Sequence, residues 1–171
     1  MTPDEIPDAQ ALVNRLLDLI RPVAQAQTVM IGVHTGGAWI AEQLHSALGL
    51  ATPLGFLDIS FYRDDFARVG LNPQVKKSTI PLDIEDASII LVDDVLYTGR
   101  TVRAAMNELF DYGRPKRIDL AVLADRGGRE LPVAARFVGT TVSLAERQSL
   151  NLTRDDAGRL RFALVEKNDA S

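Results

Sequence analysis

The chain has 171 residues, of which 46% are hydrophobic and 25% are charged, and its formal net charge is −4. Such a composition is typical of a globular protein, and the length suits one domain with a sizeable core. The negative charge argues against a strongly basic nucleic-acid-binding module, and the lack of cysteine excludes a disulfide framework and thiolate metal sites. Because the first residues lack a basic region followed by an apolar stretch, we expect a cytoplasmic protein without a secretory signal or a membrane span.

The first predicted element is an amphipathic helix. Apolar side chains recur at helical spacing over residues 12–23, and Asp8 stands ahead of them in the position of an N-cap. Since proline interrupts a helix, we expect this one to end near Pro22. The next apolar run, residues 29–33, is short and bounded by polar residues, which predicts a buried strand.

A turn and a second helix follow this strand. Residues 34–37 read His-Thr-Gly-Gly and interrupt the apolar pattern, which resumes with helical spacing over residues 38–48. Gly49 can end that helix in the left-handed conformation. A second strand is predicted over residues 54–62. By contrast, residues 63–79 are polar and show no clear period, so we interpret them as a mobile loop, with an exposed linker as the alternative.

The most informative stretch is residues 89–101, Ile-Ile-Leu-Val-Asp-Asp-Val-Leu-Tyr-Thr-Gly-Arg-Thr. Residues 89–92 predict a strand buried on both faces, which places Asp93 and Asp94 at its carboxyl end, where open α/β sheets bind ligands. Adjacent carboxylates repel each other unless a ligand, a metal or water satisfies them. The turn at residues 98–101 then offers backbone N–H groups, two hydroxyls and a helix N-terminus to a phosphate. The stretch therefore predicts a phosphorylated polyol ligand, and a helix-capping aspartate pair is the alternative.

The remaining elements complete an alternating pattern. An apolar face over residues 102–110 predicts a helix that Gly113 ends, and residues 118–123 predict a buried strand. Alternating apolar residues flank the turn at residues 155–158, which indicates a hairpin. Strands that alternate with helices predict an α/β fold with an open, twisted, mostly parallel sheet flanked by helices. The aromatic residues expected in the core rather than at an interface are Trp39, Phe56 and Phe110.

The stretch at residues 89–101 resembles the signature of the type I phosphoribosyltransferases. Three further segments narrow the resemblance to the PyrR family of uracil phosphoribosyltransferases and pyrimidine-operon regulators. They are Leu-Asp-Ile-Ser-Phe-Tyr-Arg-Asp-Asp at residues 57–65, Ile-Pro-Leu-Asp-Ile at residues 80–84 and Asp-Arg-Gly-Gly-Arg-Glu-Leu-Pro at residues 125–132. The resemblance implies a single phosphoribosyltransferase domain over residues 1–171, with a mobile lid near residues 63–79 and a small hood from the N- and C-terminal segments.

This resemblance assigns roles to the signature. In the family the acidic pair holds the ribose hydroxyls of phosphoribosyl pyrophosphate (PRPP), which implies that role for Asp93 and Asp94. Mg²⁺ is expected to arrive with the pyrophosphate, ligated mainly by substrate oxygens and water, with no dedicated protein site beyond this pair. A Walker P-loop is rejected because its earlier glycine and its lysine are missing. The residues expected to bind PRPP and its 5′-phosphate are Val95, Leu96, Tyr97, Thr98, Gly99, Arg100 and Thr101.

The turn after the first core strand corresponds to the loop with which the family binds pyrophosphate. Many relatives have Lys-Thr-Arg-Gly there, so His34 and Gly36 replace two cations that would neutralise the leaving group. The hypothesis is that a lid residue such as Arg63, Lys76 or Lys77 compensates; Arg63 is also grouped with the acidic pair as a catalytic residue. For His34 the alternative is a strand-end histidine satisfied within the fold. The residues of this loop are His34, Thr35, Gly36 and Gly37.

The expected base is uracil. Purine-using relatives often have an aspartate where this chain has Tyr97, and tyrosine offers no such base to a purine ring. The resemblance assigns base recognition to Asp125 and Arg126 at the next strand end and to the backbone of Phe137 and Val138. Surface ion pairing is the alternative for Arg126.

The resemblance therefore implies a glycosyltransferase, a uracil phosphoribosyltransferase that converts uracil and PRPP into UMP and pyrophosphate and forms a homodimer or homotetramer. PyrR relatives also bind pyrimidine-operon messenger RNA under the control of uridine nucleotides. The first helix offers only Asn14 and Arg15 before Asp18, and Gly128 stands where relatives often have histidine, so we expect weak or altered RNA recognition. The alternatives are a nucleotide-sensing RNA regulator with feeble catalysis and a hypoxanthine-type phosphoribosyltransferase. A receiver domain is rejected because it needs the acidic pair on its first strand.

Overall fold

The computed structural model describes residues 1–2, 5–59, 78–81 and 83–166. Within them, a sheet of five parallel strands has the order β2-β1-β3-β4-β5, and β6 pairs with β7 as a separate antiparallel hairpin. The predicted α/β fold is therefore confirmed. In chain order the elements are α1 (Ala9–Ile20), β1 (Val29–Val33), α2 (Gly36–Leu48), β2 (Gly55–Leu57), β3 (Ser88–Leu96), α3 (Arg100–Tyr112), β4 (Arg117–Asp125), β5 (Phe137–Thr141), β6 (Gln148–Arg154) and β7 (Leu160–Glu166).

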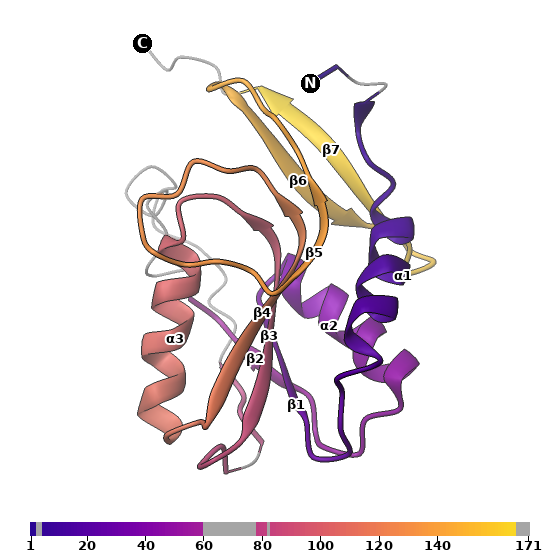
Figure 1. Cartoon of the computed structure of the whole chain (residues 1–171). Helices are drawn as coiled ribbons and strands as arrows, with labels where there is room; N and C mark the ends of the chain where they lie inside the picture. Colours follow the sequence, from indigo (N-terminus) through magenta and orange to yellow (C-terminus); the bar gives the residue numbers. More distant parts are fainter. Residues whose placement is uncertain (3–4, 60–77, 82, 167–171) are drawn as a thin grey trace.

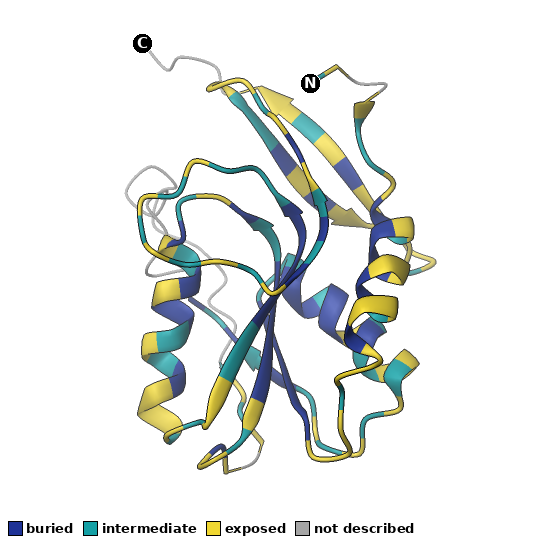
Figure 2. Ribbon diagram, viewed as in Figure 1, coloured by how far each residue is buried: buried dark blue, intermediate teal, exposed yellow. Residues whose placement is uncertain are grey.

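Helices cover both faces of the large sheet: α1 and α2 pack on one face and α3 on the other (Figure 1). Successive residues of β3 alternate between the two layers. Ile90 and Val92 join the core beneath α1 and α2, whereas Ile89 and Leu91 join the core beneath α3. Figure 2 shows the buried residues concentrated along the sheet and on the sheet-facing sides of the helices. This coverage explains why the central strand carries apolar side chains on both faces.

The first helix is confirmed at both ends. Asp8 is its N-cap, and the carboxylate accepts hydrogen bonds from the backbone N–H groups of Gln10 (2.9 Å) and Ala11 (3.4 Å). The last helical residue is Ile20, just ahead of Pro22. No helix among the described residues is long and apolar enough to cross a membrane.

The second predicted strand is shorter than expected. Residues 54–62 were predicted, but β2 spans Gly55–Leu57, and residues 60–77, with most of the predicted lid, lie outside the described residues. The last residue of that lid, Thr79, forms an antiparallel bridge to Phe56 through two backbone hydrogen bonds of 2.8 Å. This end of the segment is therefore held against the edge of the sheet.

The sequence did not predict β5, which forms the opposite edge of the sheet. Its five residues include Gly139, which weakens a strand pattern. The glycine has a tertiary cause: a Cβ at this position would lie 2.5 Å from the carbonyl oxygen of Leu123 in β4 and 3.2 Å from the Cβ of Leu12 in α1. The close approach of the β4 backbone and of α1 thus requires a residue that makes the strand hard to recognise.

The C-terminal hairpin is confirmed, with Arg154 opposite Leu160 at its turn. Leu152 and Phe162 on its inner face join the core that contains α1. The hairpin therefore packs on the main body at the side of the N-terminal segment (Figure 1). The described residues ahead of α1 form no strand, and a hood built from the N- and C-terminal segments stays a prediction.

The predicted core positions of the three aromatic residues are only partly correct. Phe56 and Trp39 are partly buried, and Trp39 packs against the core beneath α1 and α2. Phe110 is 56% exposed, so its assignment to the core is wrong. It follows the buried Leu109 in α3, and consecutive helical residues point about 100° apart, which turns Phe110 to solvent.

Candidate active site

The carboxyl ends of β1, β3 and β4 lie at one edge of the sheet, where α2 and α3 begin (Figure 1). Ligands of open α/β sheets bind at this kind of edge because loops and helix N-termini converge there. The signature stretch supplies β3, the following turn and the start of α3. This edge, which we call the site edge, is the candidate active site.

The acidic pair lies inside β3 rather than after it, because the strand extends beyond the predicted residues 89–92 to Leu96. Parallel pairing with β4 continues through this stretch, with Asp93 opposite Val122 and Leu96 opposite Asp125. Backbone pairing does not require apolar side chains, so the change of side-chain pattern at the first aspartate does not end the strand.

The two carboxylates differ in exposure and share a bonding pattern. Asp93 is 3% exposed, and Asp94 is partly buried. The Oδ1 atom of Asp93 accepts a hydrogen bond from the N–H of Asp94 at 3.0 Å, and that of Asp94 accepts one from the N–H of Val95 at 2.8 Å. These bonds orient both carboxylates at the site edge.

The predicted pyrophosphate loop meets the acidic pair at the start of α2. The helix begins at Gly36, two residues earlier than predicted, so both glycines belong to its first turn. An added Cβ on Gly36 would lie 2.8 Å from the Cγ of Asp94, and one on Gly37 would lie 2.9 Å from the Cα of Asp93. Only glycine permits this approach, which brings first-turn N–H groups and the positive helix end close to the carboxylates.

His34 and Thr35 complete this loop. The His34–Thr35 peptide bond is cis, and the backbone N–H of His34 donates to the carbonyl of Leu57 at 2.8 Å. The His34 ring stacks on Phe56 with ring centroids 5.4 Å apart. The Thr35 side chain makes no capping bond to α2.

The predicted phosphate loop, residues 97–101, joins β3 to α3. Gly99 is the N-cap of α3 and has φ 92°, a conformation that favours glycine. The hydroxyl oxygen of Thr98 accepts a hydrogen bond from the N–H of Arg100 at 3.3 Å. Arg100 also pairs with Glu130 at 2.7 Å, so its charge is partly neutralised within the protein.

Residues 126–133, which sequence reasoning did not assign to the phosphate loop, form hydrogen bonds to its main chain. In residues 126–133, the N–H of Arg126 donates to the carbonyl of Leu96 at 3.0 Å. The N–H groups of Glu130 and Leu131 donate to the carbonyl of Thr98 at 3.0 and 3.1 Å. The sequence could not have predicted these contacts, because they join backbone N–H and carbonyl groups, which every residue other than proline has.

The predicted base-binding residues Asp125 and Arg126 lie at the site edge. Burial raises the pKa of the Asp125 carboxyl, but hydrogen bonds from the Arg129 side chain and the Gly127 N–H outweigh it, so the pKa lies below its usual value. The Arg126 guanidinium stacks over the Tyr97 ring, 4.0 Å from its centroid, and donates to the carbonyl of Gln148 at 3.1 Å. Arg126 thus connects the phosphate loop to the C-terminal hairpin.

The structure does not bring Phe137 and Val138 beside Asp125. They pair with Ala121 and Val122 of β4, and Val138 therefore lies about 10 Å along the sheet from Asp125. Phe137 is 5% exposed and belongs to the core beneath α1. Thr140 and Thr141 are the β5 residues at the level of Ala124 and Asp125.

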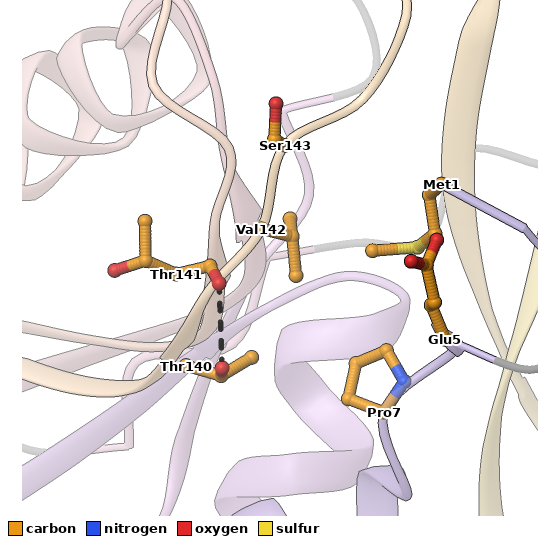
Figure 3. A pocket seen from close by; sticks show the side chains of 7 residues that line it. All are labelled: Met1, Glu5, Pro7, Thr140, Thr141, Val142 and Ser143. Carbon is orange, nitrogen blue, oxygen red and sulfur yellow. Dashed lines mark hydrogen bonds between the residues drawn. The ribbon is translucent and has the colours of Figure 1, made fainter.

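A cavity of about 410 Å³ opens where β5 leaves the sheet. In Figure 3 its walls come from two parts of the chain, the N-terminal segment and the end of β5 with the residues that follow. The backbone N–H of Val142 donates to the carbonyl of Asp125 at 2.9 Å, which ties this wall to the site edge. The lining contains neither the acidic pair nor the phosphate loop. Its residues are Met1, Glu5, Pro7, Thr140, Thr141, Val142 and Ser143.

Comparison with known proteins identifies relatives of this chain. A family model described as "Phosphoribosyl transferase domain" matches residues 4–147. A "Bifunctional protein PyrR" from Nitrosococcus oceani is 56% identical over 137 residues, which cover 79% of this chain and 76% of that protein. A second protein with this name, from Pseudomonas fluorescens, is 47% identical over 152 residues, covering 86% of this chain and 90% of that protein.

Solved structures with the same fold include two phosphoribosyltransferases. A hypoxanthine phosphoribosyltransferase from Staphylococcus aureus has a TM-score of 0.63 at 19% identity, covering 81% of this chain and 77% of that chain. A purine phosphoribosyltransferase from Pyrococcus horikoshii has a TM-score of 0.60 at 28% identity, covering 78% of this chain and 82% of that chain. At 19% identity, the similarity to the Staphylococcus aureus enzyme shows a shared fold and nothing more.

Proposed function

Because the chain belongs to the phosphoribosyltransferase domain family and, within it, to the PyrR family, we propose that it transfers the phosphoribosyl group of PRPP to uracil. The bond between C1′ of PRPP and the pyrophosphate oxygen breaks, and a bond forms between C1′ and N1 of uracil. The N1 proton leaves to water, and the products are UMP and pyrophosphate. The chain is thus a glycosyltransferase of the pentosyl-transferring class.

The observation that carries this proposal is the close placement of the acidic pair and the phosphate loop at the site edge. Asp94 and Thr98 are separated by three residues, the end of β3 and the start of the turn. Carboxylates accept hydrogen bonds from sugar hydroxyls, and main-chain N–H groups at a helix start bind phosphate. A sugar 5-phosphate presents both kinds of group within one molecule, so it suits this pair of features.

Stabilisation of the leaving group falls to the start of α2 in this proposal. Loss of pyrophosphate leaves positive character at C1′ and places negative charge on the departing oxygens, as at other glycosidic centres. The first-turn N–H groups at Gly36 and Gly37 lie at the positive end of α2, which favours an anion. They supply part of the stabilisation that relatives obtain from lysine and arginine in this loop.

The donor set suits Mg²⁺ delivered with the substrate. No group of three or more His, Asp or Glu side chains in the described part of the chain could hold a metal ion alone. The two carboxylates of Asp93 and Asp94 offer hard oxygen ligands, and the other ligands would be PRPP oxygens and water. Bound in this way, Mg²⁺ would neutralise pyrophosphate charge.

Uracil is favoured over a purine by Tyr97. Tyr97 is 44% exposed and its ring lies against the Arg126 guanidinium, so this position offers the base an aromatic and cationic surface instead of a carboxylate. Asp125 remains ionised and is available to accept a hydrogen bond from the N3–H of uracil. Roles for Phe137 and Val138 in base binding remain predictions, and the 410 Å³ cavity beside Thr140 is a further candidate for the edge of the base site.

The direct test is product formation. The purified protein is incubated with Mg-PRPP and either uracil or hypoxanthine, and UMP and IMP are separated chromatographically. We expect UMP only. IMP formation at a comparable rate would favour the hypoxanthine-type alternative, and the absence of both products would contradict the proposed transfer.

RNA regulation is a second candidate function because the relatives carry the name "Bifunctional protein PyrR". We propose weak or altered binding to pyrimidine-operon messenger RNA in this chain. Asn14 and Arg15 are exposed on α1, and Gly128 carries no side chain. A fluorescence titration with a pyrimidine-operon leader RNA at defined salt checks this. Tight binding that UMP strengthens would contradict the prediction and favour the regulator.

Two further parts of the proposal concern the lid and the assembly. Arg63 and the rest of residues 63–77 lie outside the described residues, and their closure over PRPP stays a prediction. Limited proteolysis with and without Mg-PRPP tests it, since an unchanged cleavage pattern in this segment would contradict closure. The proposed homodimer or homotetramer is checked by sedimentation equilibrium.

A further inference from the structure

Arg129 occupies an unusual position behind the phosphate loop. Its side chain is 24% exposed, and its guanidinium reaches two parts of the site at once. One NH2 contact is an ion pair with Asp125 at the end of β4, and NH1 donates to the carbonyl of Tyr97 at 2.8 Å. The Nε atom donates to the carbonyl of Val133 at 3.2 Å. An exposed surface ion pair would not be expected to have its remaining donors used in this way.

These contacts determine which way the phosphate loop presents its main chain. The carbonyls of Leu96, Tyr97 and Thr98 all accept hydrogen bonds from residues 126–133. Within a trans peptide unit the carbonyl and the following N–H point in opposite directions. The N–H groups of residues 97–99 are therefore turned away from this segment.

Of these three carbonyls, only that of Tyr97 is bound by a side chain of the described residues. Leu96 is held by the N–H of Arg126, and Thr98 is held by two further main-chain N–H groups. The orientation of the peptide unit between Tyr97 and Thr98 therefore depends on the Arg129 side chain. Substitution of the residues that bind the other two carbonyls would leave their backbone N–H donors in place. Arg129 is the position at which this arrangement can be altered without changing the phosphate loop itself.

We propose that Arg129 is a positioning residue for the 5′-phosphate, holding the Tyr97 carbonyl so that the next N–H faces the ligand. The Asp125 carboxylate, in turn, fixes the guanidinium through the ion pair. This inference rests on the proposed function, because it deepens the role of the same phosphate loop. It assigns to the segment at residues 125–132 a catalytic support role that is separate from any contact with RNA.

The test compares two ligands that differ only in the phosphate. UMP and uridine are titrated calorimetrically into the wild type, Arg129→Met and Arg129→Lys. For Arg129→Met we expect the UMP affinity to fall about ten- to a hundredfold, the range for one lost hydrogen bond to a charged donor, and the uridine affinity to stay unchanged. The UMP affinity of Arg129→Lys should lie between those of the wild type and Arg129→Met, because an ammonium cannot reproduce the planar set of donors. In turnover assays the KM for PRPP should rise while kcat changes little.

Arg136→Met is the matched control. Arg136 also pairs with an aspartate of β4, Asp119, at 2.7 Å, but it lies near the opposite end of that strand, and Asp119 keeps a second partner in Arg117. We expect wild-type affinity for both ligands. If Arg129→Met does not fold, as judged by circular dichroism, the decision falls to Arg129→Lys. A loss confined to UMP there supports the proposal.

Two results would overturn this inference while leaving the proposed function in place. Wild-type UMP affinity in a folded Arg129 variant would show that the arginine is only structural. Equal losses for UMP and uridine would show that it supports the whole site and not the phosphate loop. A wild type that binds neither UMP nor PRPP would instead refute the proposed function, and this inference with it.

Discussion

Replacement of Gly36 by alanine should displace the Asp94 carboxylate and so weaken ligand binding more than it lowers the free energy of unfolding. An added Cβ would lie 2.8 Å from the Cγ and 2.9 Å from the Cβ of Asp94. Carbon atoms in favourable contact are about 3.5–4.0 Å apart, so Asp94 must move by roughly 0.6–1.2 Å. Such a movement breaks the 2.8 Å hydrogen bond from the Val95 N–H and takes the carboxylate away from its place at the start of α2.

The functional loss follows from that displacement. A hydrogen bond to a charged group contributes about 1.5–3 kcal/mol, which corresponds to roughly a ten- to hundredfold change in a dissociation constant. We therefore expect Gly36→Ala to weaken Mg-PRPP binding by this factor in a calorimetric titration. Unfolding in urea should show a smaller loss of stability, because a partly buried carboxylate recovers hydrogen bonds to water.

Two other glycines, one in the first turn of α2 and one at its C-cap, provide controls. At Gly37 the added Cβ would meet main-chain atoms of Val92 and Asp93, which no side-chain rotation can relieve, so alanine should cost about 1–3 kcal/mol of stability. At Gly49 nothing lies within 4 Å, but φ is 63°, so alanine should cost about 1–2 kcal/mol without affecting PRPP. Wild-type PRPP affinity in Gly36→Ala would refute the assignment of Asp94 to ribose binding in its observed position.

Three further predictions address other parts of the molecule. The double substitution of Asp93 and Asp94 by asparagine should lower PRPP affinity by more than about a hundredfold without lowering the unfolding free energy, because it removes a repulsion between like charges; undiminished affinity in the same titration would contradict the ribose assignment. The pKa of Asp125 is lowered in the folded state, so its stabilising contribution is present above the unfolded value of about 4 and is lost as the pH falls through the folded pKa. Asp125→Asn should accordingly flatten the acid limb of a plot of unfolding free energy against pH, and an unchanged limb would mean that other carboxylates dominate it. In α3, Leu109→Ala should cost about 2–5 kcal/mol of unfolding free energy in urea, whereas Phe110→Ala, at a 56% exposed position, should change it by less than about 0.5 kcal/mol; similar losses would mean that Phe110 is covered in solution.

The elements that could be predicted are those whose pattern is local. The strand, turn and helix of β1 and α2 follow from an apolar run, a glycine pair and a helical period, each within a few residues. The same reasoning located β3, α3 and the C-terminal hairpin. It also placed the acidic pair and the phosphate loop at one edge of the sheet, because the carboxyl ends of parallel strands share that edge.

The errors arise where distant residues decide the local structure. Pairing with β4 carries β3 on past the acidic pair to Leu96, although the apolar pattern stops at Val92. The close approach of the β4 backbone and of α1 requires a glycine in β5, and this glycine obscures the strand. Phe110 fits a helical face by spacing, yet it lies one residue beyond the face that packs on the sheet. None of these facts can be obtained from the neighbouring residues alone.

The glycines at 127 and 128 allow the role of the segment behind the phosphate loop to be tested through packing. Both have positive φ, 69° and 72°, so alanine should incur similar backbone strain of about 1–2 kcal/mol at each. A Cβ on Gly128 would lie 3.1 Å from Cδ2 of Tyr97, whereas one on Gly127 would meet nothing within 4 Å. In urea, Gly128→Ala should therefore have a free energy of unfolding about 1 kcal/mol lower than that of Gly127→Ala. Of the two variants, only Gly128→Ala should weaken UMP binding, because it displaces the Tyr97 ring held between Gly128 and Arg126. Equal effects of the two substitutions would mean that the position of the Tyr97 ring does not matter to the phosphate loop.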